Sequence, residues 1–315
     1  MASFRFIHTS DLHLGMQFGS MPEKLRGRLT EARHEVLNTL ICVARGHSAE
    51  HILLAGDTFD TSSPSAEVRR QAVITMSAAD NIKWWIIPGN HDSLHAEELW
   101  RQFVQDAGDN VQLLRRPDAV QIADDVQLLP APLTNQFPSE DLTAWMSGHS
   151  SPNGQYRIGL AHGGVTSFSE DYDSAPIIAP DRANLANLDY LALGDWHGAK
   201  SVNERTWYSG SPERDRFRHT GKGICLAVTL PATGAIPKVK EVPVGKFFWA
   251  AQDLILNPTM DVVGELNGLL NSDQVARRNI LTQIDAKGHL RMAERGALDK
   301  AAEQAEPDFA HFVMH

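Results

Sequence analysis

The sequence predicts a layered α/β fold, and two observations support that prediction. Short apolar or β-branched runs alternate with longer amphipathic segments over about the first 200 residues. In addition, five of the short runs are followed directly by side chains that can bind a metal ion. Strand alternating with helix is typical of a sheet layered with helices, and ligands of such sheets bind beyond the carboxyl ends of the strands.

The first part of the chain contains the clearest alternation. Helices are expected around Glu23–Arg45 and Ser65–Ala79, the second beginning just after Pro64. The short apolar runs predict strands at Phe4–His8, His51–Ala55, Lys83–Ile87, Val126–Leu129, Tyr156–Ala161 and Tyr190–Leu193.

The pattern changes after about residue 200. Strands joined by turns such as PATGAIP are expected at Thr206–Ser209, Gly223–Leu230 and Val239–Val242. From Phe247 onward the pattern predicts a strand followed by helix Met260–Leu270, strand Asn279–Ile284, helix Leu290–Ala305 and strand Phe309–Met314. This compact α+β unit places a domain boundary near residue 245, which gives domains 1–245 and 246–315.

Composition excludes several classes of protein. A net charge of -10 over 315 residues argues against a protein that coats nucleic acid over its whole surface, although a nuclease with local basic contacts remains compatible. Cys42 and Cys225 are too few for a disulfide scaffold or a thiolate zinc site. No apolar run approaches the roughly 18 residues of a membrane span, and the N-terminus lacks a signal-peptide pattern. We therefore expect a cytoplasmic protein that does not enter a membrane.

Five predicted strands end in carboxylate, imidazole or amide side chains, each with glycine nearby or in the same turn. Any one of these could be only the N-cap of a following helix, but five in register favour one shared site. Asp, His and Asn without Cys suit manganese, iron or zinc, and so many ligands suit a pair of ions about 3.5–4 Å apart. The strand ends are Asp11-x-His13, Gly56-Asp57-x-x-Asp60, Gly89-Asn90-His91-Asp92, His162-Gly163-Gly164 and Gly194-Asp195-x-His197.

This ordered set, D-x-H, G-D-x-x-D, G-N-H-D, H and G-x-x-H, resembles that of the calcineurin-like metallophosphoesterases. The stretches HTSDLHLG, LLAGDTFD, PGNHD and YSGSPERDRF are similar to the SbcD-type DNA repair nucleases within that superfamily. The resemblance covers about residues 4–245, and residues 246–315 resemble the cap domain of that branch on weaker grounds. It implies a four-layer α-β-β-α sandwich with a small C-terminal α+β cap.

The resemblance also implies a role for each site residue. Asp60 would orient His13, and His91 would act as the acid near the leaving oxygen. The metal ligands would be Asp11, His13 and His197 on the first ion, Asp57 as the bridge, and Asn90 and His162 on the second ion. Asp92 is expected to be a loop or cap residue.

Asp195 departs from the family pattern, which usually has histidine at this position. A carboxylate can still bind the second ion through oxygen, so we expect two metals to bind. Its negative charge would lower the Lewis acidity of that ion and shift the preference toward harder metals. The expected cofactor is a pair of Mn²⁺ ions, with Fe²⁺, Zn²⁺ and Mg²⁺ as alternatives.

The implied reaction is phosphodiester hydrolysis by a metal-activated water, which leaves three hypotheses. The first is a DNA exonuclease or endonuclease in double-strand-break repair or DNA-end processing. The second is a phosphodiesterase or phosphatase acting on nucleotides or other small phosphoesters. The third is a non-catalytic interaction module, against which the filled ligand positions and His91 argue.

Candidate substrate contacts lie close to the last motif. Arg214, Arg216 and Arg218 could contact phosphates, but Glu213 and Asp215 offset part of their charge, and a solvated loop is an equal alternative. The Trp196 side chain could stack on a base, although packing between loops is the more frequent role for such a residue.

The resemblance implies DNA as the substrate, a homodimer, and an SMC-like, SbcC-type ATPase that docks on a tail beyond the cap. This chain ends at His315, directly after a predicted strand. The sequence leaves open whether such a partner docks elsewhere, docks on a segment beyond residue 315, or does not exist.

Overall fold

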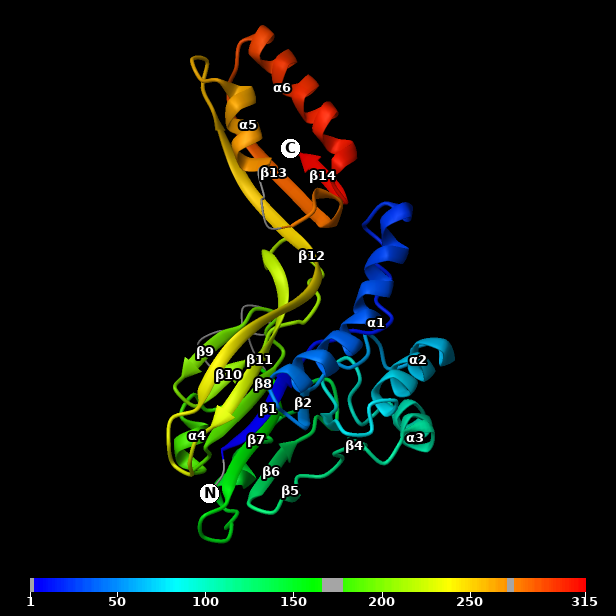
Figure 1. Ribbon diagram of the computed structural model, residues 1–315, viewed down its shortest axis with the longest axis vertical. Helices are drawn as coiled ribbons and strands as arrows, with labels where there is room; N and C mark the ends of the chain where they lie inside the picture. Colours follow the sequence, from blue (N-terminus) through cyan, green and yellow to red (C-terminus); the bar gives the residue numbers. More distant parts are fainter. Residues whose placement is uncertain (1–2, 166–177, 271–274) are drawn as a thin grey trace.

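Two β-sheets lie face to face in the computed structural model, which describes residues 3–165, 178–270 and 275–315 (Figure 1). The larger sheet comprises β1 (Phe4–Thr9), β2 (His51–Ala55), β3 (Lys83–Ile87), β4 (Val111–Leu113), β11 (Gly221–Leu230), β12 (Lys238–Leu256), β13 (Ile280–Gly288) and β14 (His311–Met314). Its strand order in the described residues is β14-β13-β12-β11-β1-β2-β3-β4.

The smaller sheet completes the pair. It comprises β5 (Val120–Ala123), β6 (Val126–Ala131), β7 (Tyr156–His162), β8 (Tyr190–Gly194), β9 (Lys200–Asn203) and β10 (Thr206–Tyr208). The order is β5-β6-β7-β8-β10-β9 in the same set of residues. Strands β1, β2 and β3 are mutually parallel, and so are β6, β7 and β8, so each group has its carboxyl ends at one edge of its sheet.

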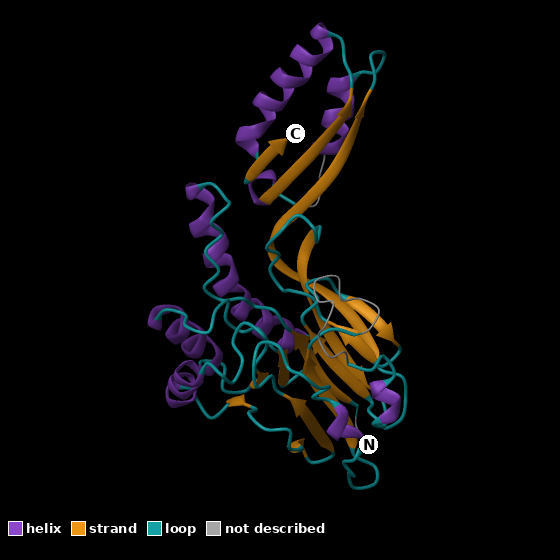
Figure 2. Cartoon of the chain, turned by 180° about the vertical axis from the view of Figure 1, so that it is seen from behind, coloured by secondary structure: helices purple, strands orange, loops and turns teal. Residues whose placement is uncertain are grey.

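Alternating side chains of β2 show how the layers form. Ile52 and Leu54 pack with the helices α1 (Glu23–Gly46), α2 (Ala66–Ser77) and α3 (Glu97–Asp106), whereas Leu53 and Ala55 pack with the smaller sheet. Successive strand residues point to opposite faces, so a fully apolar strand must be covered on both sides. The three helices accordingly lie together on one flank of the larger sheet (Figure 2).

The outer face of the smaller sheet is covered by shorter segments. Leu191 and Leu193 of β8 pack against Met146, in the 3₁₀ turn η1 (Ala144–Ser147), and Ala183, in α4 (Arg182–Leu185). The layers therefore run helix, sheet, sheet, helix, and the predicted α-β-β-α sandwich is confirmed.

Strand β12 carries the chain out of the sandwich into the C-terminal unit. It pairs antiparallel with β11 through Val242 and Pro243, and parallel with β13 from Phe248 onward. The sequence suggested two strands here, but the structure has a single long one with an irregular register beside Lys222. The unit also contains α5 (Val262–Leu270) and α6 (Met292–Ala305), and it extends away from the sandwich (Figure 1). The boundary predicted near residue 245 falls within β12 and stays a prediction.

An apolar joint connects this unit to the sandwich. Leu25 and Leu29 of α1 form one buried cluster with Phe247 and Trp249 of β12 and Leu281 of β13. Above the joint, the Arg28 guanidinium of α1 donates to the carbonyl of residue 278 at 2.7 Å. The joint therefore fixes where the unit begins relative to α1.

Among the described helices, none combines the length and the apolar character that a membrane crossing requires.

Candidate metal centre

The loops that follow β1 and β2 run side by side beyond the sheet. The backbone amide of Asp11 donates to the carbonyl of Gly56 at 3.1 Å, and that of His13 donates to the carbonyl of Asp57 at 3.0 Å. Each of these three polar residues has a positive φ: 55° for Asp11, 44° for His13 and 53° for Asp57. Residues other than glycine rarely adopt a positive φ, and residues that are held in this conformation cluster at functional sites.

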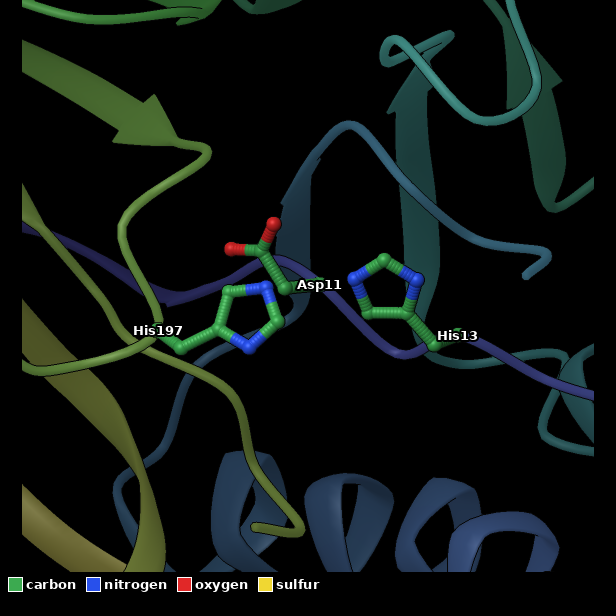
Figure 3. Close-up of side chains that lie close together, drawn as sticks. All are labelled: Asp11, His13 and His197. Carbon is green, nitrogen blue, oxygen red and sulfur yellow. The ribbon is translucent and has the colours of Figure 1, made fainter. Parts of the chain in front are cut away.

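Asp11, His13 and His197 form the first cluster of candidate ligands. One atom from each lies within 4.8 Å of the others, and each imidazole turns one ring nitrogen toward the space beside Asp11 (Figure 3). His13 is buried, and neither of its ring nitrogens has a hydrogen-bond partner in the described part of the chain. A buried imidazole without hydrogen bonds costs free energy, and a divalent cation at this position would supply the missing partner.

Asp57 lies between His13 of the first cluster and His162. Its Oδ2 atom is 3.7 Å from His13 Nε2 and 3.5 Å from His162 Nε2. Its Oδ1 atom accepts a hydrogen bond from the backbone amide of His91 at 2.9 Å. The carboxylate is therefore oriented with one oxygen facing both histidines, which is the arrangement a bridging ligand needs.

His162 is the centre of the second cluster, which also contains Asp11 and Asp57. Its Nδ1 atom donates to the carbonyl of Ala55 at 2.7 Å, and its Nε2 atom lies 2.8 Å from the Asn90 amide oxygen. Asp195 completes the group, with Oδ1 at 3.8 Å from the same Nε2 atom. The backbone amide of Asp195 points back to Asp11 Oδ1 at 3.2 Å, so the departure from the family pattern lies beside the second cluster.

The electrostatics of the centre reflect several carboxylates held close together. Burial alone would lower the pKa of His162, but the nearby charges of Asp57, Asp11 and Asp195 raise that pKa to about 9. Burial raises the pKa of Asp195 to about 6, although His162 partly opposes it. Metal ligands must release protons on coordination, so metal binding at this group of residues is expected to depend on pH.

His91 and Asp60 lie at the open side of the first cluster. The exposed His91 ring donates from Nδ1 to the carbonyl oxygen of Asp60 at 2.7 Å. Its centroid is 4.6 Å from that of His13, edge to face. Asp60 Oδ1 in turn lies 3.4 Å from His13 Nδ1. Both residues are therefore where a proton donor and an orienting carboxylate would act.

Asp92 and Gly194 keep the loops of the metal centre close together. Asp92 is fully buried and accepts hydrogen bonds from the amides of Phe59 at 3.0 Å and Gly89 at 2.7 Å, which fits the expected loop role. Gly194 leaves no room for a side chain, because a Cβ there would lie 1.9 Å from the carbonyl oxygen of Ala55. Close approach of the β2 and β8 ends therefore requires glycine.

The three arginines that are candidate substrate contacts have different surroundings in the structure. Arg214 is only 7% exposed and donates to the carbonyl of His197, so its guanidinium is engaged within the protein and its phosphate contact stays a prediction. Arg216 forms a two-point pair with Asp215, at 3.1 Å for each hydrogen bond. Arg218 lies over the Trp196 ring, 5.9 Å from its centroid. Arg216 and Arg218 remain exposed on the loop beside the centre.

Asp215 is the residue that the sequence did not identify as part of the site. Its carboxylate was counted only as a charge that offsets the arginines, yet its side chain is 2% exposed and lies 3.2 Å from His197 Nδ1. The spacing of the sequence motifs contains no signal for this contact, because the contact depends on the path of the loop after β10.

Comparison with known proteins agrees with this geometry. Residues 4–226 match the family described as calcineurin-like phosphoesterase. The SbcD subunit of nuclease SbcCD from Escherichia coli (strain K12) is 25% identical over 285 residues, covering 76% of this chain and 68% of that protein. The "uncharacterized metallophosphoesterase YhaO" of Bacillus subtilis (strain 168) is 24% identical over 237 residues, covering 72% of this chain and 57% of that protein.

A solved structure, that of TT1561 of Thermus thermophilus, matches 77% of this chain and 100% of its own with a TM-score of 0.49 and 11% identity. The family match spans most of the chain, including every candidate ligand from Asp11 to His197. The chain belongs to the calcineurin-like phosphoesterase family, and it is a metal-dependent phosphoesterase of that family.

Proposed function

We propose that this protein is a two-metal phosphodiesterase that cleaves DNA during the processing of DNA ends. The observation that carries the proposal is the position of Asp57 Oδ2 between His13 Nε2 and His162 Nε2, at 3.7 and 3.5 Å. One carboxylate facing two histidine clusters is the arrangement of a site for two ions that share a ligand.

The donor set fits divalent metals that accept both nitrogen and oxygen, and Mn²⁺ is our first choice. When bound, two such ions would activate a water molecule and neutralise charge on the phosphate oxygens. The residues that would hold them are Asp11, His13 and His197 for the first ion, Asp57 for both, and Asn90, His162 and Asp195 for the second.

His91 is the proposed proton donor to the leaving oxygen. The carbonyl of Asp60 can only accept a hydrogen bond, so it fixes the Nδ1 proton of His91. The protonated ring then has its remaining N–H, on Nε2, free to reach the leaving group. The adjacent His13 ring and the amide-to-Asp57 hydrogen bond hold His91 in position.

A groove of about 1090 Å³ beside His91 supports a substrate larger than a simple phosphomonoester. Hydroxyl and amide side chains line much of it, including Thr61, Ser62, Ser63, Ser93, Asn135 and Gln136. On the other side of the centre, Lys200 and Arg218 lie over Trp196. Local positive charge of this kind suits phosphate contacts on an otherwise acidic protein.

The decisive experiment compares substrates under the same metal conditions. Linear duplex DNA, single-stranded DNA, bis-p-nitrophenyl phosphate and cyclic nucleotides are each incubated with Mn²⁺, Mg²⁺ or Zn²⁺. We expect metal-dependent cleavage of DNA. Hydrolysis of the small esters alone would replace the nuclease with a small-phosphoester hydrolase, and inactivity on all substrates would favour an interaction module.

The name of the Escherichia coli relative describes one subunit of a nuclease. We therefore include in the proposal a homodimer and an SMC-like, SbcC-type ATPase partner. Light scattering of the purified protein and co-purification with such an ATPase test these two points separately from the chemistry.

A further inference from the structure

Asp215 is a buried carboxylate in the loop that follows β10, and the catalytic proposal above does not use it. Its Oδ2 atom lies 3.2 Å from His197 Nδ1 and 3.1 Å from Arg216 Nη2. The Nδ1 atom of His197 is itself buried and has no aligned hydrogen-bond partner in the described residues. Asp215 is therefore the polar group positioned to receive that nitrogen's proton.

The orientation of the His197 ring indicates what the contact with Asp215 does. One ring nitrogen turns toward Asp11 and the other turns away (Figure 3), and the nitrogen near Asp215 is Nδ1. A histidine that binds a metal through one nitrogen usually donates from the other to a carboxylate or carbonyl, which fixes its tautomer and orientation. We propose that Asp215 is a positioning residue that presents His197 Nε2 to the first metal ion.

The other two candidate histidine ligands follow the same arrangement. His13 Nδ1 lies 3.4 Å from an Asp60 carboxylate oxygen, and His162 Nδ1 donates to the carbonyl of Ala55 at 2.7 Å. Each of the three imidazoles thus has an oxygen atom close to Nδ1, and for His162 this oxygen accepts a hydrogen bond. The two histidines of the first cluster have carboxylates, which raise the basicity of a ligand more than a carbonyl does.

Several positively charged or proton-donating groups surround Asp215 in this buried position, so none of them alone determines its charge. Arg216 covers both carboxylate oxygens from the solvent side, at 3.1 Å each. Arg33 of α1 is buried behind the first cluster and donates from Nη1 to the carbonyl of Leu12. Burial alone would raise the pKa of Asp215, but His197, Arg216 and Arg33 hold it well below its usual range.

The alternative role for Asp215 is to hold Arg216 for the substrate. Measuring the metal affinity of two variants distinguishes these roles. If Asp215 positions His197, Asp215→Asn weakens metal binding and Arg216→Ala does not. If Asp215 serves only Arg216, both variants bind metal normally and both change the KM for substrate.

The test is calorimetric titration of the metal-free 315-residue protein with Mn²⁺. It rests on the metal centre of the proposed function and not on the nuclease activity, so an enzyme without DNA cleavage can still pass it. We expect Asp215→Asn to weaken binding about 10–100-fold. Asp308→Asn, which removes an arginine-paired carboxylate in the C-terminal unit, and Arg216→Ala should stay within about twofold of wild type.

Two results would overturn the proposal: unchanged Mn²⁺ affinity in a folded Asp215→Asn protein, or an equal loss in Arg216→Ala. A measurement on the unmutated chain covers the case in which the variant does not fold. Long-range ¹H–¹⁵N spectra of ¹⁵N-histidine protein loaded with Zn²⁺ should show His197 protonated at Nδ1 and metal-bound at Nε2. Metal bound at Nδ1 would contradict the proposal directly.

Discussion

Asp195 changes the charge of the second cluster, where the resembled motif has histidine. Its carboxylate lies 3.8 Å from His162 Nε2, and its backbone amide binds Asp11. Its φ of 101° is unusual for a residue with a side chain. At the scale of one residue, this substitution exchanges a neutral ligand for a negative one and raises the proton affinity of its neighbour.

The first prediction tests that charge. Asp195→Asn should lower the pKa of His162 from about 9, because the Asp195 carboxylate is one of the charges that raise it. Histidine NMR titration of the metal-free protein measures this pKa. The control is Asp189→Asn, a buried carboxylate at the opposite end of β8 that should leave the His162 titration unchanged. An unaltered pKa in Asp195→Asn would place the carboxylate elsewhere.

The second prediction concerns His91. His91→Ala should reduce kcat about 10²–10⁴-fold, because a positioned general acid typically contributes that much. Mn²⁺ stoichiometry should remain that of the wild type, since His91 is exposed and belongs to neither of the two clusters that contain Asp11, although its ring lies close to His13 and Asp60. Wild-type turnover in the variant would assign the proton transfer to another group.

The third prediction concerns His51, which is buried on β2 and accepts a hydrogen bond from the Trp85 indole at 2.9 Å. Burial, with a smaller effect of Lys83, lowers the pKa of His51 from 6.5 to about 4. A lowered folded pKa stabilises the protein above pH 6.5, and this stability is lost as pH falls toward about 4.

His51→Gln should therefore make the loss of unfolding free energy between pH 7 and pH 4 smaller, by up to about 3 kcal/mol. Urea denaturation at the two pH values measures the change. The same replacement at the exposed His289 is the control and should leave the pH dependence as in the wild type.

At the scale of secondary structure, the sequence predicted best where a segment is buried on both faces. Strands β2 and β3 have the predicted bounds, because fully apolar runs between helices have few alternatives. The sequence pattern did not predict α3, which begins at Glu97 without a side-chain cap. The pattern also predicted two strands, Val239–Val242 and one from Phe247 onward, where β12 is continuous.

The division of β12 could not be corrected from local sequence. The buried carboxylate of Glu213 accepts hydrogen bonds from the amides of Lys246 at 2.6 Å and Phe247 at 3.1 Å, which carries the strand through its irregular region. The candidate ligands were predictable because each lies at the end of a strand or a few residues beyond it. Asp215 and Arg214 were not, because their contacts with His197 depend on the three-dimensional path of a loop.

The fourth prediction tests the close approach of strand ends. Gly194→Ala places a Cβ against the carbonyl of Ala55, which also receives His162 Nδ1. We expect it to cost about 1–3 kcal/mol of unfolding free energy and to weaken Mn²⁺ binding. Gly27→Ala in α1 meets nothing within 4 Å and should instead stabilise by about 0.5–1 kcal/mol. Equal, small effects for both would show that the β8 end can move freely.

At the scale of the whole molecule, the C-terminal unit is joined to the metal centre through packing as well as through the chain. Trp249 of β12 is fully buried at the joint with α1, and its ring lies 4.9 Å from that of Phe217. Phe217 belongs to the loop that contains Asp215 and Arg216. Displacement of the C-terminal unit at this joint would therefore shift the loop that contacts His197.

The fifth prediction follows from that packing. Trp249→Ala should cost about 3–5 kcal/mol, as expected for a large buried aromatic. Because the joint includes residues of α1, β12 and β13, calorimetry should show the sandwich and the C-terminal unit unfolding together in the wild type. Two separated wild-type transitions, with only one of them shifted by the variant, would show that the joint does not couple the two parts.

The candidate ligands also determine when the centre can form during biosynthesis. The amide of Asp195 and the carboxylate of Asp11 are 184 residues apart in sequence, and His197 lies further still along the chain. The amino-terminal ligands must therefore leave the ribosome long before their partners exist. Contacts over such sequence distances form late, so metal loading is expected to follow folding as a maturation step. The supply of metal would then decide how much of the folded protein is active.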